Sequence, residues 1–303
     1  MIIVDETKVF VLGDGIMDTR QARIEIFEGT RRVCENNDSL KNSIEKSRLE
    51  QKIYWEGEKI EHGQPRVAAP VKLVLSKQKT VEATRKYAED GKKVCILNFA
   101  SSVTPGGGVL IGAQAQEECI CRVSTLYFAI SDKNTAGRFY DKHWELIREK
   151  KMNRRNTDDI IYTPNVVVVC DESSGEKMLS EEEWYTVDVI TCAAPDIRIT
   201  NDETEYRPGS EELYREFVKR WRCILAAGAK HKADVLILGA FGCGVFANPP
   251  ELVARAFCDA VVDFKNYFDT IEFAIYSSGE DNINYSKFEN VLYQNVLWSK
   301  RGE

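Results

Sequence analysis

The segment at residues 94–127 places the strongest limits on how this chain can fold. It begins with a short apolar run, Val94 to Leu97, which is typical of a strand buried on both faces. Three glycines follow at 106–108, and Gln-Glu-Glu at 116–118 then begins a segment with helical spacing. Because glycine tolerates positive φ, successive N–H groups can turn toward one point and a ligand can approach the main chain closely. The segment therefore predicts a strand, a glycine loop and a helix that together suit a sugar or a phosphate.

The two glutamates lie in or near the first turn of this predicted helix. Its apolar members repeat at intervals of three and four residues: Cys119, Val123, Leu126, Tyr127 and Ile130. Glu118 falls outside that stripe, in line with Arg122 and Thr125, so we expect its side chain to be free to face a ligand. Each feature alone also has a structural explanation, because a glutamate in a first turn stabilises the helix dipole.

A second glycine loop follows the apolar strand expected at residues 235–238. Gly239, Gly242 and Gly244 form its turn, and Pro249 and Pro250 open a helix with a regular apolar face. Outward N–H groups and a helix dipole can together bind an anion at such a place. A tight turn that needs glycine for steric reasons explains the same residues equally well.

The rest of the chain alternates strand and helix patterns. Strand patterns lie at 9–12, 53–55, 166–169, 187–195 and 271–277, and helix patterns at 39–51, 80–90, 138–150, 210–227 and 288–298. In the fourth of these helices Ser210 is the expected N-cap and Gly228 the expected stop. The alternation predicts an α/β fold with a mixed, mostly parallel sheet and helices on both faces. Both glycine loops follow strand ends, so we expect them on the same edge of the sheet.

The spacing of GGG, seven residues and QEE resembles the signature of poly(ADP-ribose) glycohydrolases. The longer string NFASSVTPGGG is similar to the bacterial-type members of this macrodomain family, as is the order YTPNVVVVC, polar loop, VDVITCAAP. The string DTRQARIEIFEG resembles their accessory N-terminal region. The resemblance implies a three-layer α/β/α macrodomain-like catalytic core at residues 81–303, preceded by an accessory region at residues 1–80.

The resemblance also implies an activity, which is hydrolysis of the O-glycosidic ribose–ribose bond of poly(ADP-ribose) with release of ADP-ribose. Glu118 would be the general acid, and Glu117 would hold or orient the substrate hydroxyl. ADP-ribose would be bound by Asn98, Gly106, Gly107, Gly108, Gln116, Gly242, Cys243, Gly244, Val245, Phe246 and Tyr276. Phe246 would lie against the distal ribose, and Tyr276 or its neighbour Ser277 would border the adenine.

The pKa of the proposed acid is subject to opposing effects. A helix N-terminus lowers the pKa of a carboxyl group, whereas an acid must remain protonated near neutral pH. An adjacent carboxylate and a sugar that excludes water raise the pKa. The sequence leaves open which effect dominates.

The composition limits the partners. A net charge of -7 gives no general attraction to nucleic acid or to an anionic membrane. No secretory signal and no apolar segment of membrane-spanning length is present, so we expect a cytoplasmic protein. The nine cysteines contain no CxxC pair and the three histidines are isolated, so we expect no metal, cofactor or disulfide framework. The resemblance implies ADP-ribose, poly(ADP-ribose) and ADP-ribosylated macromolecules as partners.

Three functions are compatible with these residues. The first is hydrolysis of poly(ADP-ribose), and the second is hydrolysis of ADP-ribose from a mono-modified protein or nucleic acid. The third is recognition of ADP-ribose without turnover, which the presence of both Glu117 and Glu118 disfavours because a binding module needs no proton donor. Bacterial-type members commonly have Asn where this chain has Ser101, and a hydroxyl offers one donor where an amide offers two. This difference favours the second function slightly.

Overall fold

The computed structural model describes residues 19–173, 175–198, 209–277 and 282–295. Its centre is a seven-stranded sheet in the order β1-β4-β7-β3-β8-β9-β2. The strands from β7 to β2 are parallel, and β4 runs antiparallel to both β1 and β7. The bounds are β1 Lys52–Tyr54, β2 Lys72–Ser76, β3 Val94–Phe99, β4 Ile160–Val168, β7 Tyr185–Cys192, β8 Val235–Leu238 and β9 Thr270–Ala274. A two-stranded sheet, β5 Cys170–Asp171 with β6 Lys177–Met178, stands apart. The predicted mixed, mostly parallel sheet is confirmed.

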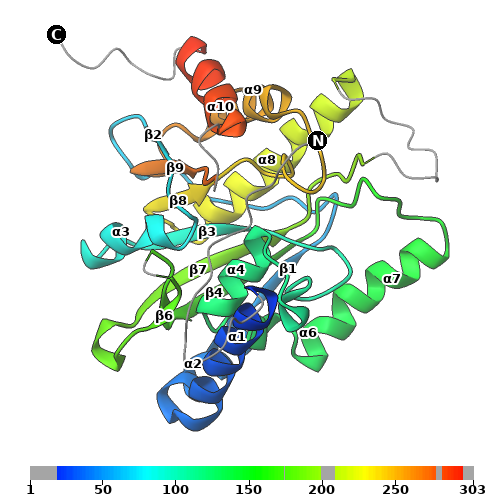
Figure 1. Ribbon diagram of the computed structural model, residues 1–303. Coiled ribbons are helices and arrows are strands. Elements are labelled where there is room, and N and C mark those ends of the chain that lie inside the picture. The colour runs from blue at the N-terminus through cyan, green and yellow to red at the C-terminus, as the bar shows by residue number, and fades with distance from the viewer. Residues whose placement is uncertain (1–18, 174, 199–208, 278–281, 296–303) are drawn as a thin grey trace, which may run out of the picture.

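Helices cover both faces of this sheet (Figure 1). The α-helices are α1 Thr19–Asn36, α2 Asp38–Glu50, α3 Arg85–Glu89, α4 Gln116–Val123, α5 Leu126–Ile130, α6 Lys133–Arg138, α7 Tyr140–Arg148, α8 Glu211–Lys230, α9 Pro250–Val261 and α10 Ile283–Gln294. Short 3-10 turns are η1 Glu82–Thr84, η2 Val109–Ile111, η3 Glu181–Glu183 and η4 Val262–Phe264. None of the described helices is long and apolar enough to cross a membrane.

Strand β3 shows why the sheet is buried on both faces. Cys95 and Leu97 belong to the apolar core that α8, α9 and α10 cover. Val94 and Ile96 alternate with them and belong to the core beneath α1, α2, α4 and α5. Side chains of a strand point alternately to opposite faces, so a continuous apolar run fits a strand with a core on each side. The interpretation of residues 94–97 as a doubly covered strand is confirmed.

Helix α8 begins as predicted but ends later than predicted. Ser210 is its N-cap, because the Ser210 side chain accepts a hydrogen bond from the N–H of Leu213 at 3.2 Å. Gly228 lies inside the helix, which continues to Lys230, so its prediction as the stop was wrong. A Cβ atom at Gly228 would lie 3.2 Å from the ring of Phe268. Glycine is therefore needed here for close packing of the helix and not for a left-handed cap.

Other predicted elements are divided in the structure. The helix expected at 80–90 consists of η1 followed by α3, and the one expected at 138–150 is mainly α7, which follows α6 after Phe139. The helical stripe expected from residue 116 to 130 is divided into α4 and α5, because Ser124 is extended and pairs with Val168 in an isolated β-bridge. The strand expected at 9–12 lies outside the described residues.

The boundary near residue 80 between an accessory region and a core remains a prediction. The structure adds that β1 and β2, which precede this boundary, belong to the same sheet as the later strands. β2 pairs in parallel with β9, and β1 pairs with β4. Helices α1 and α2 lie together against one face of that sheet (Figure 1).

Candidate functional site

The two glycine loops meet at one edge of the sheet. They follow β3 and β8, which are parallel neighbours, so both loops leave the sheet at the carboxyl ends of their strands. The rings of Phe99, at the end of β3, and Phe241, in the second loop, have centroids 5.5 Å apart. A Cβ atom at Gly239 would contact the ring of Phe99, so the two loops pack closely where they begin.

The first glycine loop folds against the two glutamates of α4. Gly106 has φ of 71° and Gly107 has φ of 56°, which are left-handed values that favour glycine. A Cβ atom at Gly107 would collide with the carboxyl group of Glu118 and lie 3.1 Å from an oxygen of Glu117. The glycine run thus allows the main chain to approach both carboxyl groups from one side.

Glu117 is a buried carboxyl group held by the chain segment that follows β3. Its Oε2 accepts the N–H of Ser101 at 2.7 Å, and its Oε1 accepts from Nδ2 of Asn98 at 3.3 Å. The side chain is almost completely buried, and the pKa of Glu117 is raised to about 8. Burial is the main cause, and the charge of Glu118 adds to it, whereas the hydrogen bonds from Ser101 and Asn98 act in the opposite direction. This carboxyl group is therefore protonated at neutral pH.

We expect the raised pKa of Glu117 to make the protein less stable as the pH rises. The folded state keeps the proton up to about pH 8, whereas the unfolded chain releases it near the ordinary glutamate value of 4.5. Between these values the folded state binds more protons, so the free energy of unfolding falls by up to about 1.4 kcal/mol per pH unit. Urea unfolding of wild type and Glu117→Gln from pH 5 to 9 measures this. In the variant, the free energy of unfolding should fall less steeply with pH than in wild type. Parallel curves of the two proteins would contradict the raised pKa of Glu117.

Glu118 offers one oxygen to the glycine loop and leaves the other without a hydrogen bond. Its Oε1 accepts the N–H of Gly108 at 2.8 Å, while its Oε2 is buried and has no partner among the described residues. The same holds for Oδ1 of Asn98 and for the hydroxyl of Tyr140, which is near Glu117. Buried polar atoms are rarely left unpaired, so three of them around one pair of carboxyl groups indicate a ligand-binding site.

The helical wheel predicted that Glu118 lies outside the buried apolar stripe of α4, and this side chain is in fact nearly buried. Glu118 is 7 % exposed, and Arg122, which the wheel also placed off the apolar stripe, is 1 % exposed. Val123 was predicted on the buried stripe and is buried, whereas Cys119, predicted on the same stripe, is half-buried. Ile120 and Cys121, which the stripe left out, are buried as well. Almost the whole of α4 is enclosed, because α1 and the glycine loop cover the side that does not face the sheet.

Gln116 connects the start of α4 to two neighbouring segments. Its Oε1 accepts the N–H of Phe99 at 2.8 Å, and its Nε2 donates to Leu97 O at 2.8 Å and to the hydroxyl of Thr80 at 3.0 Å. Both ends of the amide are engaged within the protein. Binding of ADP-ribose by Gln116 remains a prediction, and the contacts fix the end of β3 relative to α4.

Asn248 fixes the shape of the second glycine loop through hydrogen bonds to main-chain carbonyl groups. The Asn248 amide donates to Pro195 O at 2.7 Å and to Gly242 O at 2.9 Å, and Gly242 has φ of 74°. A Cβ atom at Gly244 would meet nothing within 4 Å, and Val245 is exposed. The loop therefore presents main-chain atoms around Gly244 to the surface, as binding of an anion by N–H groups requires.

Three further residues predicted to bind ADP-ribose are Phe246 and Cys243 of the second loop and Tyr276 after β9. Phe246 is partly buried and lies 5.5 Å from the guanidinium of Arg198, which pairs with Asp196. Burial raises the pKa of the Cys243 thiol well above its usual range, so this cysteine is not a reactive thiolate. Tyr276 follows β9, is exposed, and has the ammonium of Lys79 5.5 Å from its ring. These positions leave the predicted roles of Phe246, Cys243 and Tyr276 as predictions.

Three residues of the site were not identified from the sequence. Tyr140 and His143 come from α7, and Asn248 follows the GCGVF string. A single tyrosine, histidine or asparagine carries no spacing pattern. The only sequence signal was the position of Asn248 directly before two prolines at the start of a helix.

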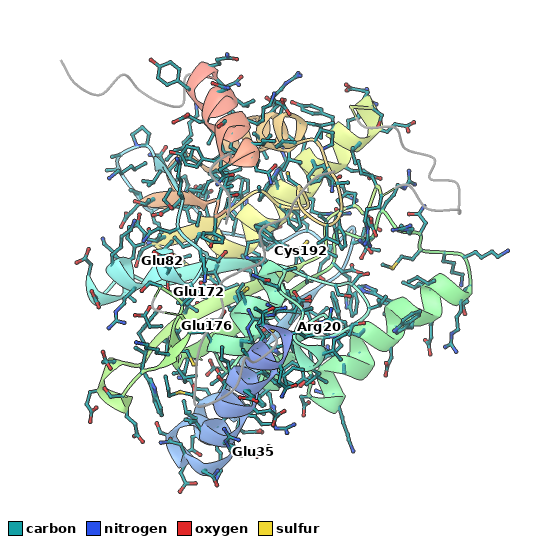
Figure 2. All side chains as sticks on the ribbon, in the orientation of Figure 1. Arg20, Glu35, Glu82, Glu172, Glu176 and Cys192 are labelled. Atoms are coloured by element: carbon teal, nitrogen blue, oxygen red, sulfur yellow. The ribbon has the colours of Figure 1, made fainter. Side chains whose placement is uncertain are left out.

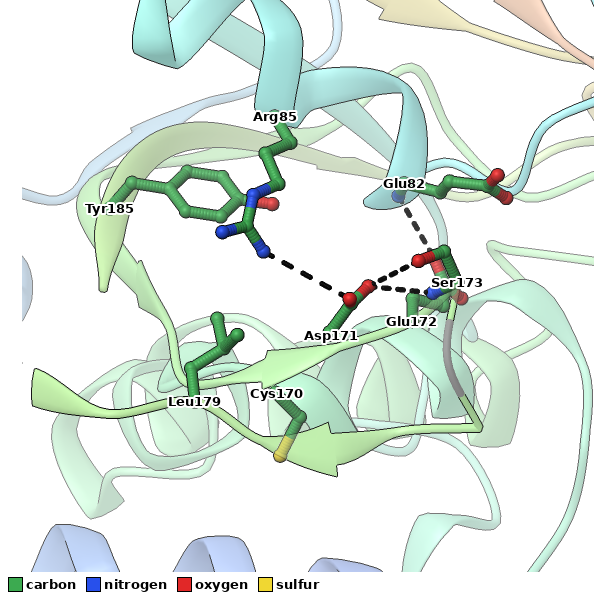
Figure 3. A pocket seen from close by; sticks show the side chains of 8 residues that line it. All are labelled: Glu82, Arg85, Cys170, Asp171, Glu172, Ser173, Leu179 and Tyr185. Atoms are coloured by element: carbon green, nitrogen blue, oxygen red, sulfur yellow. Dashed lines mark hydrogen bonds and ion pairs between the residues drawn. The ribbon is translucent and has the colours of Figure 1, made fainter. Parts of the chain in front are cut away.

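A small hollow lies elsewhere in the molecule. Its lining includes Arg85 and Asp171, which form an ion pair at 4.0 Å, together with Glu172 and Tyr185 (Figure 3). Glu82, Glu172 and Glu176 gather on this side of the molecule (Figure 2). None of the residues predicted to bind ADP-ribose lines this hollow.

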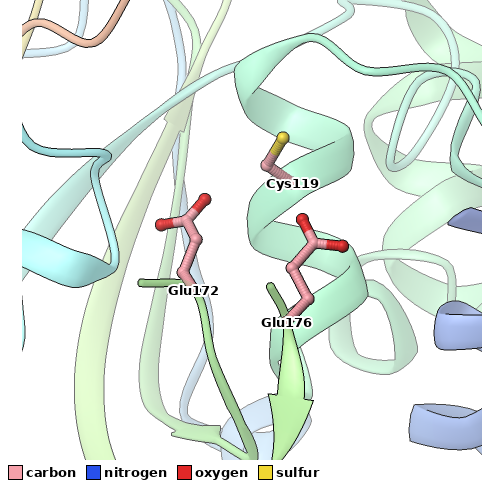
Figure 4. A group of neighbouring side chains, drawn as sticks. All are labelled: Cys119, Glu172 and Glu176. Carbon is pink, nitrogen blue, oxygen red and sulfur yellow. The ribbon is translucent and has the colours of Figure 1, made fainter. Parts of the chain in front are cut away.

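A metal-like grouping of side chains adjoins the hollow. Ligand atoms of Cys119, Glu172 and Glu176 lie within 4.8 Å of one another (Figure 4). The guanidinium of Arg122 donates to Glu176 at 3.0 Å and to the Cys119 sulfur at 3.1 Å. Arg122 thus already supplies positive charge to two of the three side chains, and the grouping acts as a buried salt-bridge network.

Comparison with known proteins gives one family. Residues 21–171 match the model of the microbial-type PARG catalytic domain. The chain is similar to the crystal structure of poly(ADP-ribose) glycohydrolase from Thermomonospora curvata, with 29% identity, 90% of this chain and 100% of that chain covered, and a TM-score of 0.77. The structure from that organism bound to the inhibitor ADP-HPD has 27% identity and a TM-score of 0.73, and the match covers 89% of this chain and 99% of that chain. The Deinococcus radiodurans glycohydrolase in complex with ADP-ribose has 27% identity and a TM-score of 0.71, and the match covers 84% of this chain and 98% of that chain. No curated protein sequence matches the chain.

Proposed function

We propose, on the premise that the chain belongs to the microbial-type PARG family, that it hydrolyses the ribose–ribose bond of poly(ADP-ribose) and releases ADP-ribose. One observation carries the proposal. Glu118 is fixed through Oε1 to the glycine loop at Gly108, while its buried Oε2 has no partner among the described residues. A carboxyl group with one oxygen fixed and one available can transfer a proton in a defined direction.

In the proposed reaction, the carboxyl group of Glu118 gives a proton to the oxygen of the leaving ribose. The glycosidic C–O bond breaks, and the remaining sugar takes on oxocarbenium character. A water molecule attacks the anomeric carbon, and its proton returns to the carboxylate of Glu118. The carboxyl groups of Glu117 and Glu118 both lie next to Gly107, so the two acids share one site.

We propose that the second glycine loop binds the diphosphate of the same ADP-ribose unit. The support is its position beside the first loop, its exposed main chain around Gly244, and the guanidinium of Arg198 next to Phe246. Protonated Glu117 would donate a hydrogen bond to a hydroxyl of the ribose that Glu118 serves. The similar glycohydrolase structures were solved in complex with ADP-ribose and with the inhibitor ADP-HPD, which supports a ligand of this class.

The second candidate function, removal of ADP-ribose from a mono-modified acceptor, has one observation in its favour. The Ser101 hydroxyl accepts the N–H groups of Val103 and Thr104 at 3.3 and 3.1 Å. It is therefore engaged in a local turn, and it offers the substrate less than the amide common at this position in bacterial-type relatives. Weaker contacts at Ser101 would suit a substrate whose binding depends less on this contact to the ribose.

A labelled-substrate assay distinguishes these functions. Wild-type protein is incubated with poly(ADP-ribose) and, separately, with a mono-ADP-ribosylated protein, and released ADP-ribose is measured by chromatography. Release from the polymer supports the first function, and release from the mono-modified acceptor alone selects the second. Calorimetric binding of ADP-ribose without turnover of either conjugate would exclude a hydrolase and indicate a binding module.

A further inference from the structure

Helix α7 holds the chain segment that follows β3 by two consecutive carbonyl groups. Nδ1 of His143 lies 2.8 Å from Ser102 O, and Nε1 of Trp144 donates to Val103 O at 3.1 Å. His143 is 1 % exposed, so its imidazole ring is enclosed by protein. The two neighbouring rings thus attach α7 to the turn immediately after Ser101.

The two ring nitrogens of His143 face two hydrogen-bond acceptors. A carbonyl oxygen only accepts hydrogen bonds, so Nδ1 must carry a proton to bind Ser102 O. Nε2 lies 2.8 Å from Oδ2 of Asp159, which also accepts from the Thr157 hydroxyl and, through Oδ1, from the N–H of Glu56. Burial raises the pKa of Asp159, but the hydrogen bonds from His143, Thr157 and Glu56 outweigh it and the net pKa is lowered. Asp159 is therefore ionised and anchors the ring of His143 through Nε2.

The segment held by His143 also holds Glu117. Ser101 donates its N–H to Oε2 of Glu117 at 2.7 Å, and the next residue, Ser102, presents its carbonyl to the histidine. The Ser102 hydroxyl donates to Asn156, whose amide in turn donates to Ala194 O. The turn is thus fixed on one side by α7 and on the other by the segment after β7.

We propose that His143, held between Ser102 O and Asp159, is a positioning residue that keeps the Ser101 N–H directed at Glu117. This inference rests on the proposed function only for its kinetic readout. The buried carboxylate of Asp159 fixes one ring nitrogen, so the other stays directed at the carbonyl of Ser102.

Two substitutions separate the two contacts of His143. In His143→Asn the side-chain amide can occupy the place of Nδ1 and keep the bond to Ser102 O, whereas in His143→Gln it can occupy the place of Nε2 and keep the bond to Asp159. We expect His143→Gln to lower kcat roughly tenfold to a hundredfold with a smaller change in KM, because a loosened turn misplaces Glu117. His143→Asn should retain most of kcat although it loses the contact with Asp159. The matched control is His231→Gln, which removes a histidine that contacts Tyr54 and Tyr162 away from the site.

Two spectroscopic measurements test the proposal independently of turnover. Nitrogen NMR of wild-type protein should show a hydrogen-bonded proton on Nδ1 of His143, and an Nδ1 without one would overturn the proposal even if the variants fail to fold. Carbon NMR of the Glu117 carboxyl should show a higher titration midpoint in His143→Gln than in His143→Asn, because the Ser101 hydrogen bond favours the ionised form. Equal midpoints in both variants would also overturn it. If wild type hydrolyses no conjugate, the proposed function fails while these two measurements still decide the role of His143.

Discussion

Replacing Glu118 with glutamine is expected to lower kcat for polymer hydrolysis by roughly a hundredfold to ten-thousandfold, the range that one general acid contributes. Glutamine has the size of glutamate, and its carbonyl oxygen can still accept the N–H of Gly108. Its amide has no proton that it can transfer to a leaving alkoxide. Steady-state kinetics with labelled polymer measure kcat, and calorimetry measures ADP-ribose affinity, which should stay close to wild type because the fixed oxygen is kept.

A second buried glutamate provides the control for this substitution. Glu172 is also nearly enclosed, and its Oε2 accepts the N–H groups of Val81 and Glu82. It lines the hollow and not the glycine loops, so Glu172→Gln should keep the wild-type kcat even if stability falls. Near-normal turnover by Glu118→Gln, or an equal loss in Glu172→Gln, would exclude Glu118 as the specific proton donor.

Most strands of the large sheet could be predicted, because each carries an apolar signal in its own residues, whereas β2 was not predicted. The apolar run of β3 and the β-branched run within β4 carry the signal locally, and the two cores on either side follow from continuous burial. The break between α4 and α5 could not be predicted, because Ser124 leaves the helix to pair with Val168, which is distant in the chain. Gly228 had a good local signal for a helix end, but packing against Phe268 determines its place.

The candidate site, like the fold, has parts that could be predicted from the sequence and parts that could not. The strand, glycine loop and Gln-Glu-Glu segment are close in sequence, so their proximity could be inferred before any fold was known. His143 was an isolated histidine without a neighbouring ligand pattern, and only the fold brings Asp159 and Ser102 to its two nitrogens. The raised pKa of Glu117 also depends on enclosure by segments that the helical wheel of α4 does not contain.

Substituting Gly107 with alanine is expected to be the most damaging change that adds a single methyl group. At φ of 56° a side chain costs about 1–2 kcal/mol in conformation. The new Cβ would also collide with the carboxyl group of Glu118, and relief of such crowding costs a further 1–3 kcal/mol or so. Because the collision displaces the proposed acid, we expect kcat to fall about a hundredfold in addition to the loss of stability. Urea unfolding and polymer kinetics measure the two effects.

Gly91→Ala separates the conformational cost from the collision. Gly91 has φ of 70°, but a Cβ atom there would meet nothing within 4 Å. This variant should therefore lose only about 1–2 kcal/mol and keep the wild-type kcat. If Gly107→Ala lost no more stability than Gly91→Ala and kept its turnover, the carboxyl group of Glu118 could move away from the glycine loop without consequence. The bond from Gly108 N–H to Glu118 would then not be the contact that orients the proton donor, and the proposed direction of proton transfer would be wrong.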